Sequence, residues 1–264
     1  MLDKGTLERL YARYADRSHA ERDPVSFLYR YREAADREIA GLVAAFLAYG
    51  RLKQIMRSVE DALSRLGPRP ARTILGSTSR ELRHACGGFV HRLVDAAGLH
   101  ALLRAVQDVV RTHGSIQACF LAHDDPAVAD VQPGLVGLAR ELRQGRAELA
   151  HLVADPAKGS ACKRWHLYLR WLVRRDAVDP GGWGSVSPAR LLVPLDAHMW
   201  RVCSGLGLTR RKCCNLAAAR EITCHFRRVC PADPVRYDFA LMHASVGGDP
   251  ELGVLLDTAP SGRP

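Results

Sequence analysis

Apolar residues recur along this chain at the three- and four-residue spacing of amphipathic α-helices, and they almost never alternate as in a β-strand. The core positions this spacing predicts are Leu7, Leu10, Tyr11 and Tyr14; Ile39, Leu42, Val43, Phe46 and Leu47; Ile55, Met56, Val59, Leu63 and Leu66; and Leu99, Leu102, Leu103, Val106 and Val110. Later helices are predicted over 135–149, 215–227 and 235–246. We therefore expect an all-α fold.

Prolines and glycines divide these segments. Pro24 ends the first helix, because the residue before a proline is pushed out of the α region. After Gly87-Gly88, residues Phe89 to Leu93 are expected to begin another helix, with His91 and Arg92 solvated. The tail from 249 to 264 contains glycine and proline and is expected to be loose.

Lys163 stands in the first turn of a helix that follows Gly159-Ser160. Burial there and the positive charge of Arg164 would both favour the neutral amine, which is the nucleophilic form. One face of this helix is expected to pack and the other to be cationic. The expected cationic face comprises Lys163, Leu167, Arg170 and Arg174. The alternative interpretation is a surface lysine on a solvated basic helix.

Asp196 follows Pro194-Leu195 and opens a helix that is expected to end at Gly207. An aspartate at this position is an ordinary N-cap. The same carboxylate, held by backbone N–H groups, stays ionised and suits the stabilisation of a developing cation. His198, two residues on, either donates to a phosphate, which helix starts favour, or packs.

The chain has 264 residues and a formal net charge of +10, which is typical of a protein with a polyanionic partner such as nucleic acid and equally of a basic protein whose surface charge is spread out. The spacing of its eight cysteines is not that of a regular disulfide framework, so we expect reduced thiols. The last four cysteines lack the spacing of an iron–sulfur cluster, and we expect no metal. The longest apolar run, residues 39–48, is too short to span a bilayer. No signal peptide is recognised, and a cytoplasmic protein is expected.

The segment PLDAHMWRVCSGLGL, residues 194–208, resembles the signature helix of the helix-hairpin-helix DNA glycosylases, and its Asp-Ala-His-Met-Trp run is similar to the 8-oxoguanine branch. The separation of Lys163 and Asp196 (196 − 163 = 33 residues) is similar to that in the archaeal 8-oxoguanine glycosylases. Together with GSACKRWHLYLRWLVRRDAVDPGGW and DPVRYDFAL, the pattern resembles an uncharacterised bacterial family related to this superfamily, over roughly residues 24 to 248.

This resemblance implies a single glycosylase-like unit of two lobes with the active cleft between them. Lobe one would cover about 38–175 with the hairpin, and lobe two about 1–37 plus 185–248. The catalytic residues would be Lys163 and Asp196. The DNA-contacting residues would be Gly159, Ser160, Arg164, His198, Arg51 and Lys53, with Arg51 as the wedge that fills the gap in the base stack (Tyr49 and Leu52 are alternatives). The base pocket would include Phe239, Asp238 and Trp183.

Each of these assignments has a structural alternative. Arg51 and Lys53 also fit a plain helix–helix turn, Phe239 also fits core packing, and Trp183 also fits a plug that fastens its loop. The hairpin departs from the family pattern as well. Ser160 replaces the usual hydrophobic residue, and Ala161 replaces the second of the two glycines that let backbone N–H groups approach a DNA phosphate.

The implied function is base-excision DNA repair. Lys163 would displace a damaged, oxidised purine such as 8-oxoguanine, and the Schiff base formed would permit strand cleavage by AP lyase chemistry, with no cofactor. The expected partner is double-stranded DNA containing a damaged base, bound by a monomer at the nucleoid. The alternatives are a non-catalytic helix-hairpin-helix DNA-binding module and an RNA- or nucleotide-modifying protein with the same fold.

Overall fold

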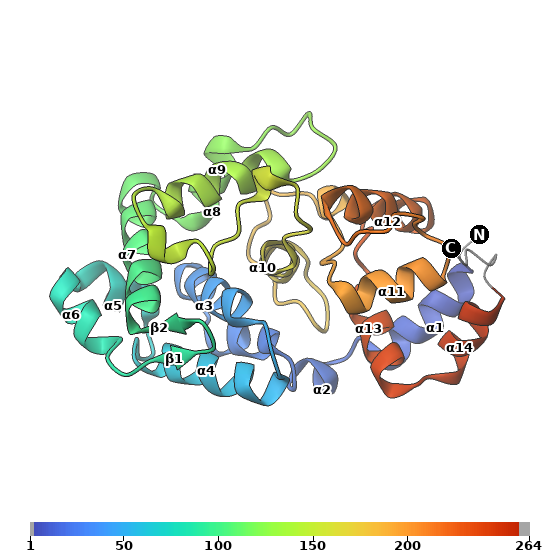
Figure 1. The fold of residues 1–264 in the computed structure, drawn as a ribbon, viewed down its shortest axis with the longest axis horizontal. Coiled ribbons are helices and arrows are strands. Elements are labelled where there is room, and N and C mark those ends of the chain that lie inside the picture. The colour runs from blue at the N-terminus through green and yellow to red at the C-terminus, as the bar shows by residue number, and fades with distance from the viewer. Residues whose placement is uncertain (1–2, 259–264) are drawn as a thin grey trace. The chain divides into compact units, whose positions relative to one another are not determined.

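A computed structural model describes residues 3–258, and these residues are mainly helical (Figure 1). The expected all-α class is confirmed: within this range the sole sheet is the antiparallel pair β1 (Val90–His91) and β2 (Val94–Asp95). The chain divides into two compact units. Unit 1 comprises residues 1–20 and 158–264, and unit 2 comprises 21–157. No described helix is long and apolar enough to cross a membrane.

These bounds differ from those of the expected lobes, because residues 158–175 belong with the C-terminal half of the chain. Two kinds of contact hold them there. The backbone N–H of Gly181 donates to Trp171 O over 3.0 Å, and Arg170 forms an ion pair with Asp238. Lys163 and Asp196 therefore lie in the same unit.

Unit 2 is built around helix α3 (Ala34–Leu47), which is buried on nearly every side. Two of its carboxylates point to the starts of other helices. Asp36 accepts a hydrogen bond from Ala71 N (2.8 Å), and Glu38 accepts one from Ile116 N (3.0 Å). Buried acids are tolerated here because they satisfy N–H groups that a helix leaves unpaired. The other helices of the unit are η1 (Pro24–Arg30), α4 (Leu52–Ser64), α5 (Pro70–Gly76), α6 (Ser79–Ala85), α7 (Ala96–His113), α8 (Ile116–His123), α9 (Gln132–Arg143) and η2 (Ala147–Leu149).

The stretch Phe89 to Leu93 forms a hairpin and not the expected helix. Gly88 (φ 74°) and Arg92 (φ 55°) are left-handed, a conformation that a right-handed helix cannot include. The β1–β2 register pairs His91 with Val94. The side chain of His91 is buried, and its Nδ1 lies 2.9 Å from Ser58 Oγ, so the expectation of a solvated histidine was wrong.

Unit 1 joins the N-terminal helix to the C-terminal half. Helix α1 (Lys4–Tyr14) packs against α13 (Asp238–Gly247) and α14 (Pro250–Asp257) (Figure 1). Arg13 and Tyr14 both bond to Asp249 Oδ2, over 2.5 and 2.8 Å. The remaining helices are α2 (Arg17–Ala20), η3 (Pro156–Lys158, at the boundary of the units), α10 (Lys163–Val173), η4 (Pro188–Arg190), α11 (Ala197–Gly205) and α12 (Leu216–Val229).

Helix α14 corrects the expectation of a loose tail. Asp249 caps it by accepting from Glu251 N (2.8 Å), Pro250 occupies its first turn, and Leu252 is buried. Gly253 and Pro250, which suggest a loop, therefore belong to this helix. The last residues of the expected tail, 259–264, lie outside the described residues.

Candidate active site in unit 1

Lys163 and Asp196 form an ion pair. Lys163 Nζ lies 2.6 Å from Asp196 Oδ2, and the two side chains are 34% and 38% exposed. The amine is therefore less buried than expected from its place after a tight turn. It is reachable from solvent, and its partner is a single carboxylate from the start of another helix.

The turn before α10 sets the position of Lys163. Gly159 (φ 75°) and Cys162 (φ 43°) are left-handed, whereas Ala161 is not. The backbone N–H of Leu216 donates to Gly159 O (3.0 Å), and Ser160 forms an isolated antiparallel bridge with Asn215. The start of α12 thus contacts this turn through the backbone. After Gly159, the left-handed conformation is adopted by Cys162 and not by Ala161, which stands at the second glycine position.

Asp196 is the N-cap of α11, as predicted. Its Oδ1 accepts from Met199 N (2.8 Å), which leaves Oδ2 for the lysine. Partial burial would raise the pKa of this carboxyl, but the charge and hydrogen bond of Lys163 and the amides of the helix start outweigh burial and lower its pKa. At the other end of the helix Gly207 (φ 71°) is left-handed, which agrees with the predicted C-terminal glycine.

The expected cationic face of α10 was wrong, because Arg170 and Arg174 are buried, 2% and 4% exposed. Arg170 binds both oxygens of Asp238 over 2.9 and 3.0 Å and also bonds to Asp179. Arg174 pairs with Asp179, with Asp176 (2.7 Å) and with Asp233 (2.9 Å). Burial would lower the pKa of Arg174, but these carboxylates outweigh it and raise that pKa well above its usual value.

The three residues expected in a base pocket are all buried. Trp183 is 1% exposed and meets the ring of Tyr168 edge-on, with centroids 5.4 Å apart. Asp238 accepts hydrogen bonds from Arg170, and Phe239 packs on the ring of His243 (4.3 Å between centroids). In this structure they pack in the interior of unit 1, which agrees with the alternative interpretation for Trp183 and Phe239.

The residues expected to contact DNA fall in both units. Ser160 is exposed, while Gly159, Arg164 and His198 are half-buried in unit 1 near the starts of α10 and α11. The buried Nε2 of His198 has no hydrogen-bond partner among the described residues. Arg51 and Lys53 are exposed in unit 2, where Arg51 is the N-cap residue of α4.

Sequence reasoning missed Cys214. Its half-buried thiol donates to Leu195 O (3.9 Å), next to Asp196 in the chain. Burial raises the pKa of this thiol, Asp196 raises it further, and Lys163 acts in the opposite direction. The adjacent pair Cys213-Cys214 is visible in the sequence, but its position beside the ion pair depends on the bridge between Ser160 and Asn215.

One comparison with known proteins finds a match. Residues 23–247 fit the family described as "Protein of unknown function (DUF2400)". No curated protein and no solved structure matches the chain. Because the matched residues span most of the sequence, the chain belongs to this family of unknown function.

Proposed function

We propose that this protein is a DNA glycosylase with AP lyase activity that uses Lys163 as nucleophile. The observation that carries the proposal is the 2.6 Å contact between Lys163 Nζ and Asp196 Oδ2, with both side chains open to solvent. A lysine amine beside a fixed carboxylate is the pair that this chemistry requires. The resemblance of residues 159–208 to the glycosylases supplies the substrate class.

The ion pair also provides the proton transfer that the reaction needs. The paired amine carries a proton that must leave before nitrogen can attack, and Asp196 Oδ2 lies within hydrogen-bond distance to accept it. The amine then bonds to the anomeric carbon as the glycosidic bond breaks, and the base departs with the bonding electrons. Opening of the sugar ring gives the Schiff base, and loss of the neighbouring proton eliminates the 3′ phosphate.

The turn around Gly159 and Ser160 is a suitable phosphate contact. It lies against the start of α12, and the segment just before α12 carries the exposed residues Arg210 and Lys212. Exposed basic side chains beside a solvent-facing lysine favour a DNA backbone over a neutral ligand. The favoured lesion, by resemblance, is an oxidised purine such as 8-oxoguanine in a duplex.

Borohydride trapping tests the proposal. The full-length chain is incubated with duplexes holding 8-oxoguanine or an abasic site, and the covalent adduct is resolved on a denaturing gel. We expect an adduct with the wild type and none with Lys163→Gln, while Lys158→Gln, an exposed lysine in the preceding η3, keeps it. Asp196→Asn should slow trapping by on the order of 100-fold or more.

The negative outcomes are distinct. An adduct that persists in Lys163→Gln contradicts the assignment of the nucleophile. No adduct with any lesion, together with tight and salt-sensitive duplex binding, overturns the enzyme and leaves a non-catalytic DNA-binding module.

A further inference from the structure

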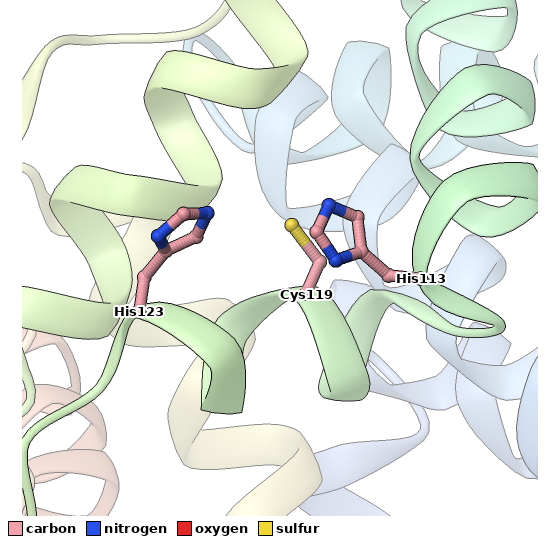
Figure 2. Close-up of side chains that lie close together, drawn as sticks. All are labelled: His113, Cys119 and His123. Atoms are coloured by element: carbon pink, nitrogen blue, oxygen red, sulfur yellow. The ribbon is translucent and has the colours of Figure 1, made fainter.

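Two histidines and a cysteine gather in unit 2, far along the chain from Lys163. His113 ends α7, and Cys119 and His123 lie on α8 (Figure 2). One ligand atom from each, a ring nitrogen or the sulfur, lies within 4.8 Å of the other two. The sulfur of Cys119 points between the two imidazole rings in Figure 2.

The chain brings these groups together by a tight helix–helix turn. Gly114 is left-handed (φ 88°) and ends α7, and Ser115 starts α8 by accepting from Ala118 N (2.9 Å). Cys119 and His123 are four residues apart and so share one face of α8. Glu38 fixes the start of α8 through the N–H of Ile116. The three side chains are thus held by packed helices and not by a loop.

His123 lacks the polar partner that a buried ring nitrogen ordinarily has. Its Nε2 is buried and makes no hydrogen bond within the described chain, although Glu141 Oε1 on α9 lies 3.4 Å away. That separation is long for a hydrogen bond. It equals the spacing of about 3.4 Å between two N or O ligands of one tetrahedral zinc ion.

Helix α9 leaves space for the side chain of His123 at Gly137. A Cβ added at Gly137 would overlap the Cβ and Cγ atoms of the histidine, so a glycine is needed for the ring to lie there. The thiol of Cys119 is fully buried. Edge-on packing of the two rings, whose centroids are 6.1 Å apart, accounts for the His113–His123 contact, but it gives the Nε2 of His123 no hydrogen bond within the described residues.

We propose that His113, Cys119 and His123, whose ligand atoms converge, bind one Zn²⁺ ion, and that Glu141, which lies near His123 alone, turns toward the ion as the fourth donor. One thiolate, two imidazoles and a carboxylate form a donor set that suits zinc more than magnesium or calcium. Four protein ligands from α7, α8 and α9 close the coordination shell and make the ion a structural tie between these helices. The Cys119 thiol gives its proton to solvent as it bonds to the ion.

The side of the site at Glu141 is open to solvent. Glu141 lies in the wall of an open surface cavity of about 270 Å³, together with Thr112, the neighbour of His113 in the chain, and Gln144. The side chains of His123 and Glu141 are 22% and 29% exposed. Binding therefore does not require the unit to unfold.

Cobalt substitution tests the site directly. The full-length protein is stripped with a chelator, loaded with Co²⁺ or Zn²⁺, and measured by elemental analysis and absorption spectroscopy. We expect one ion per chain, a thiolate-to-cobalt charge-transfer band and the visible bands of tetrahedral cobalt. Cys119→Ser should lose the charge-transfer band, whereas Cys86→Ser, a buried cysteine of the same unit, should keep it.

Thermal unfolding gives a second readout. Zinc should raise the midpoint of the wild type and of Cys86→Ser but not that of Cys119→Ser or His123→Gln. Glu141→Gln, which removes a charged ligand, should weaken zinc binding by about 10-fold or more. Gly137→Ala, which displaces His123 without removing a ligand, should weaken it as well. Far-UV circular dichroism checks that each stripped variant is folded.

The site is overturned if the stripped protein takes up no zinc. It is equally overturned if Cys119→Ser and His123→Gln hold zinc as tightly as Cys86→Ser, because the ion would then sit on other thiols, such as the exposed Cys213 and Cys224. Unchanged binding in Glu141→Gln removes Glu141 as fourth donor.

Discussion

The two ends of α10 carry ion pairs of opposite character. At its start Lys163 pairs with Asp196, and roughly a third of each side chain faces solvent. At its other end Arg170 and Arg174 are buried among carboxylates that come from the loop after the helix and from residues 233–238. An exposed lysine can exchange its partner for water, but a buried arginine cannot lose its partners without leaving an unpaired charge.

The two ends differ in what their loss would cost the fold. The exposed pair can separate at small cost, as the proposed function requires. The buried network joins α10 to the loop around Asp179 and to the start of α13, and so holds the helix on which Lys163 stands. Basic residues on one helix therefore serve different purposes according to the carboxylates that meet them.

The largest effect is expected when the buried network is broken. Arg174→Met leaves Asp179 buried without one of its cations and should lower the free energy of unfolding by about 3–5 kcal/mol. Arg175→Met, at the exposed neighbouring position, should change it by less than about 0.5 kcal/mol. Denaturant titration measures both, and equal losses in the two variants would contradict the contrast between buried and exposed charges.

The free energy of unfolding should depend on pH through the half-buried His243 but not through an exposed histidine. Burial, then His19, then Arg170 lower the pKa of His243 from 6.5 to about 4. The unfolded chain therefore binds this proton first. The associated stability, at most about 3 kcal/mol, is complete above the unfolded pKa and is lost as pH falls through the folded pKa.

Substitution of the histidine isolates this effect. His243→Gln cannot titrate, so its free energy of unfolding should fall less than that of the wild type between neutral pH and pH of about 4. His84→Gln, at an exposed histidine, should follow the wild type. Parallel curves for the wild type and His243→Gln would show that burial and the neighbouring groups do not lower the pKa of this ring.

A smaller effect is expected at Asp196, where capping and ion pairing can be separated. Asp196→Ala removes the acceptor for Met199 N and should lower the free energy of unfolding by about 1 kcal/mol. Asp196→Asn keeps an oxygen that caps α11 and should lose only a few tenths of a kcal/mol. Thermal and denaturant unfolding compare the two; an equal loss would show that the ion pair, not the cap, stabilises this end.

The smallest effect is expected for Lys163→Gln. The exposed ion pair should contribute less than about 1 kcal/mol, because solvent screens it and both side chains lose freedom on pairing. The variant should remain folded by circular dichroism while it loses the borohydride adduct. A loss of stability as large as that of Arg174→Met would remove the distinction between the two ends of α10.

Local signals predicted much of the fold. The spacing of apolar residues located α1, α3, α4 and α7, and both the cap Asp196 and the left-handed Gly207 could be identified because capping depends on neighbours in the chain. The pairing of Lys163 with Asp196 came from a resemblance, since spacing alone cannot bring two distant residues together. The structure places the two side chains in contact.

Long-range partners explain what the sequence could not predict. Arg170 and Arg174 repeat at helical spacing like a solvated basic face, and nothing local shows that Asp233 and Asp238 will cover them. The His113, Cys119 and His123 group is different, because its spacing was readable. It was not predicted, because only the last four cysteines were considered as metal ligands.

The packing of α1 against α13 and α14 also has a consequence for synthesis. Residues 1–20 emerge from the ribosome before unit 2, yet their partners are translated only after all of unit 2. At roughly 5–20 residues per second the nascent first helix waits on the order of ten seconds for them. Unit 2 can fold during that interval, so unit 1, which holds the candidate catalytic pair, is completed only after unit 2 has been translated.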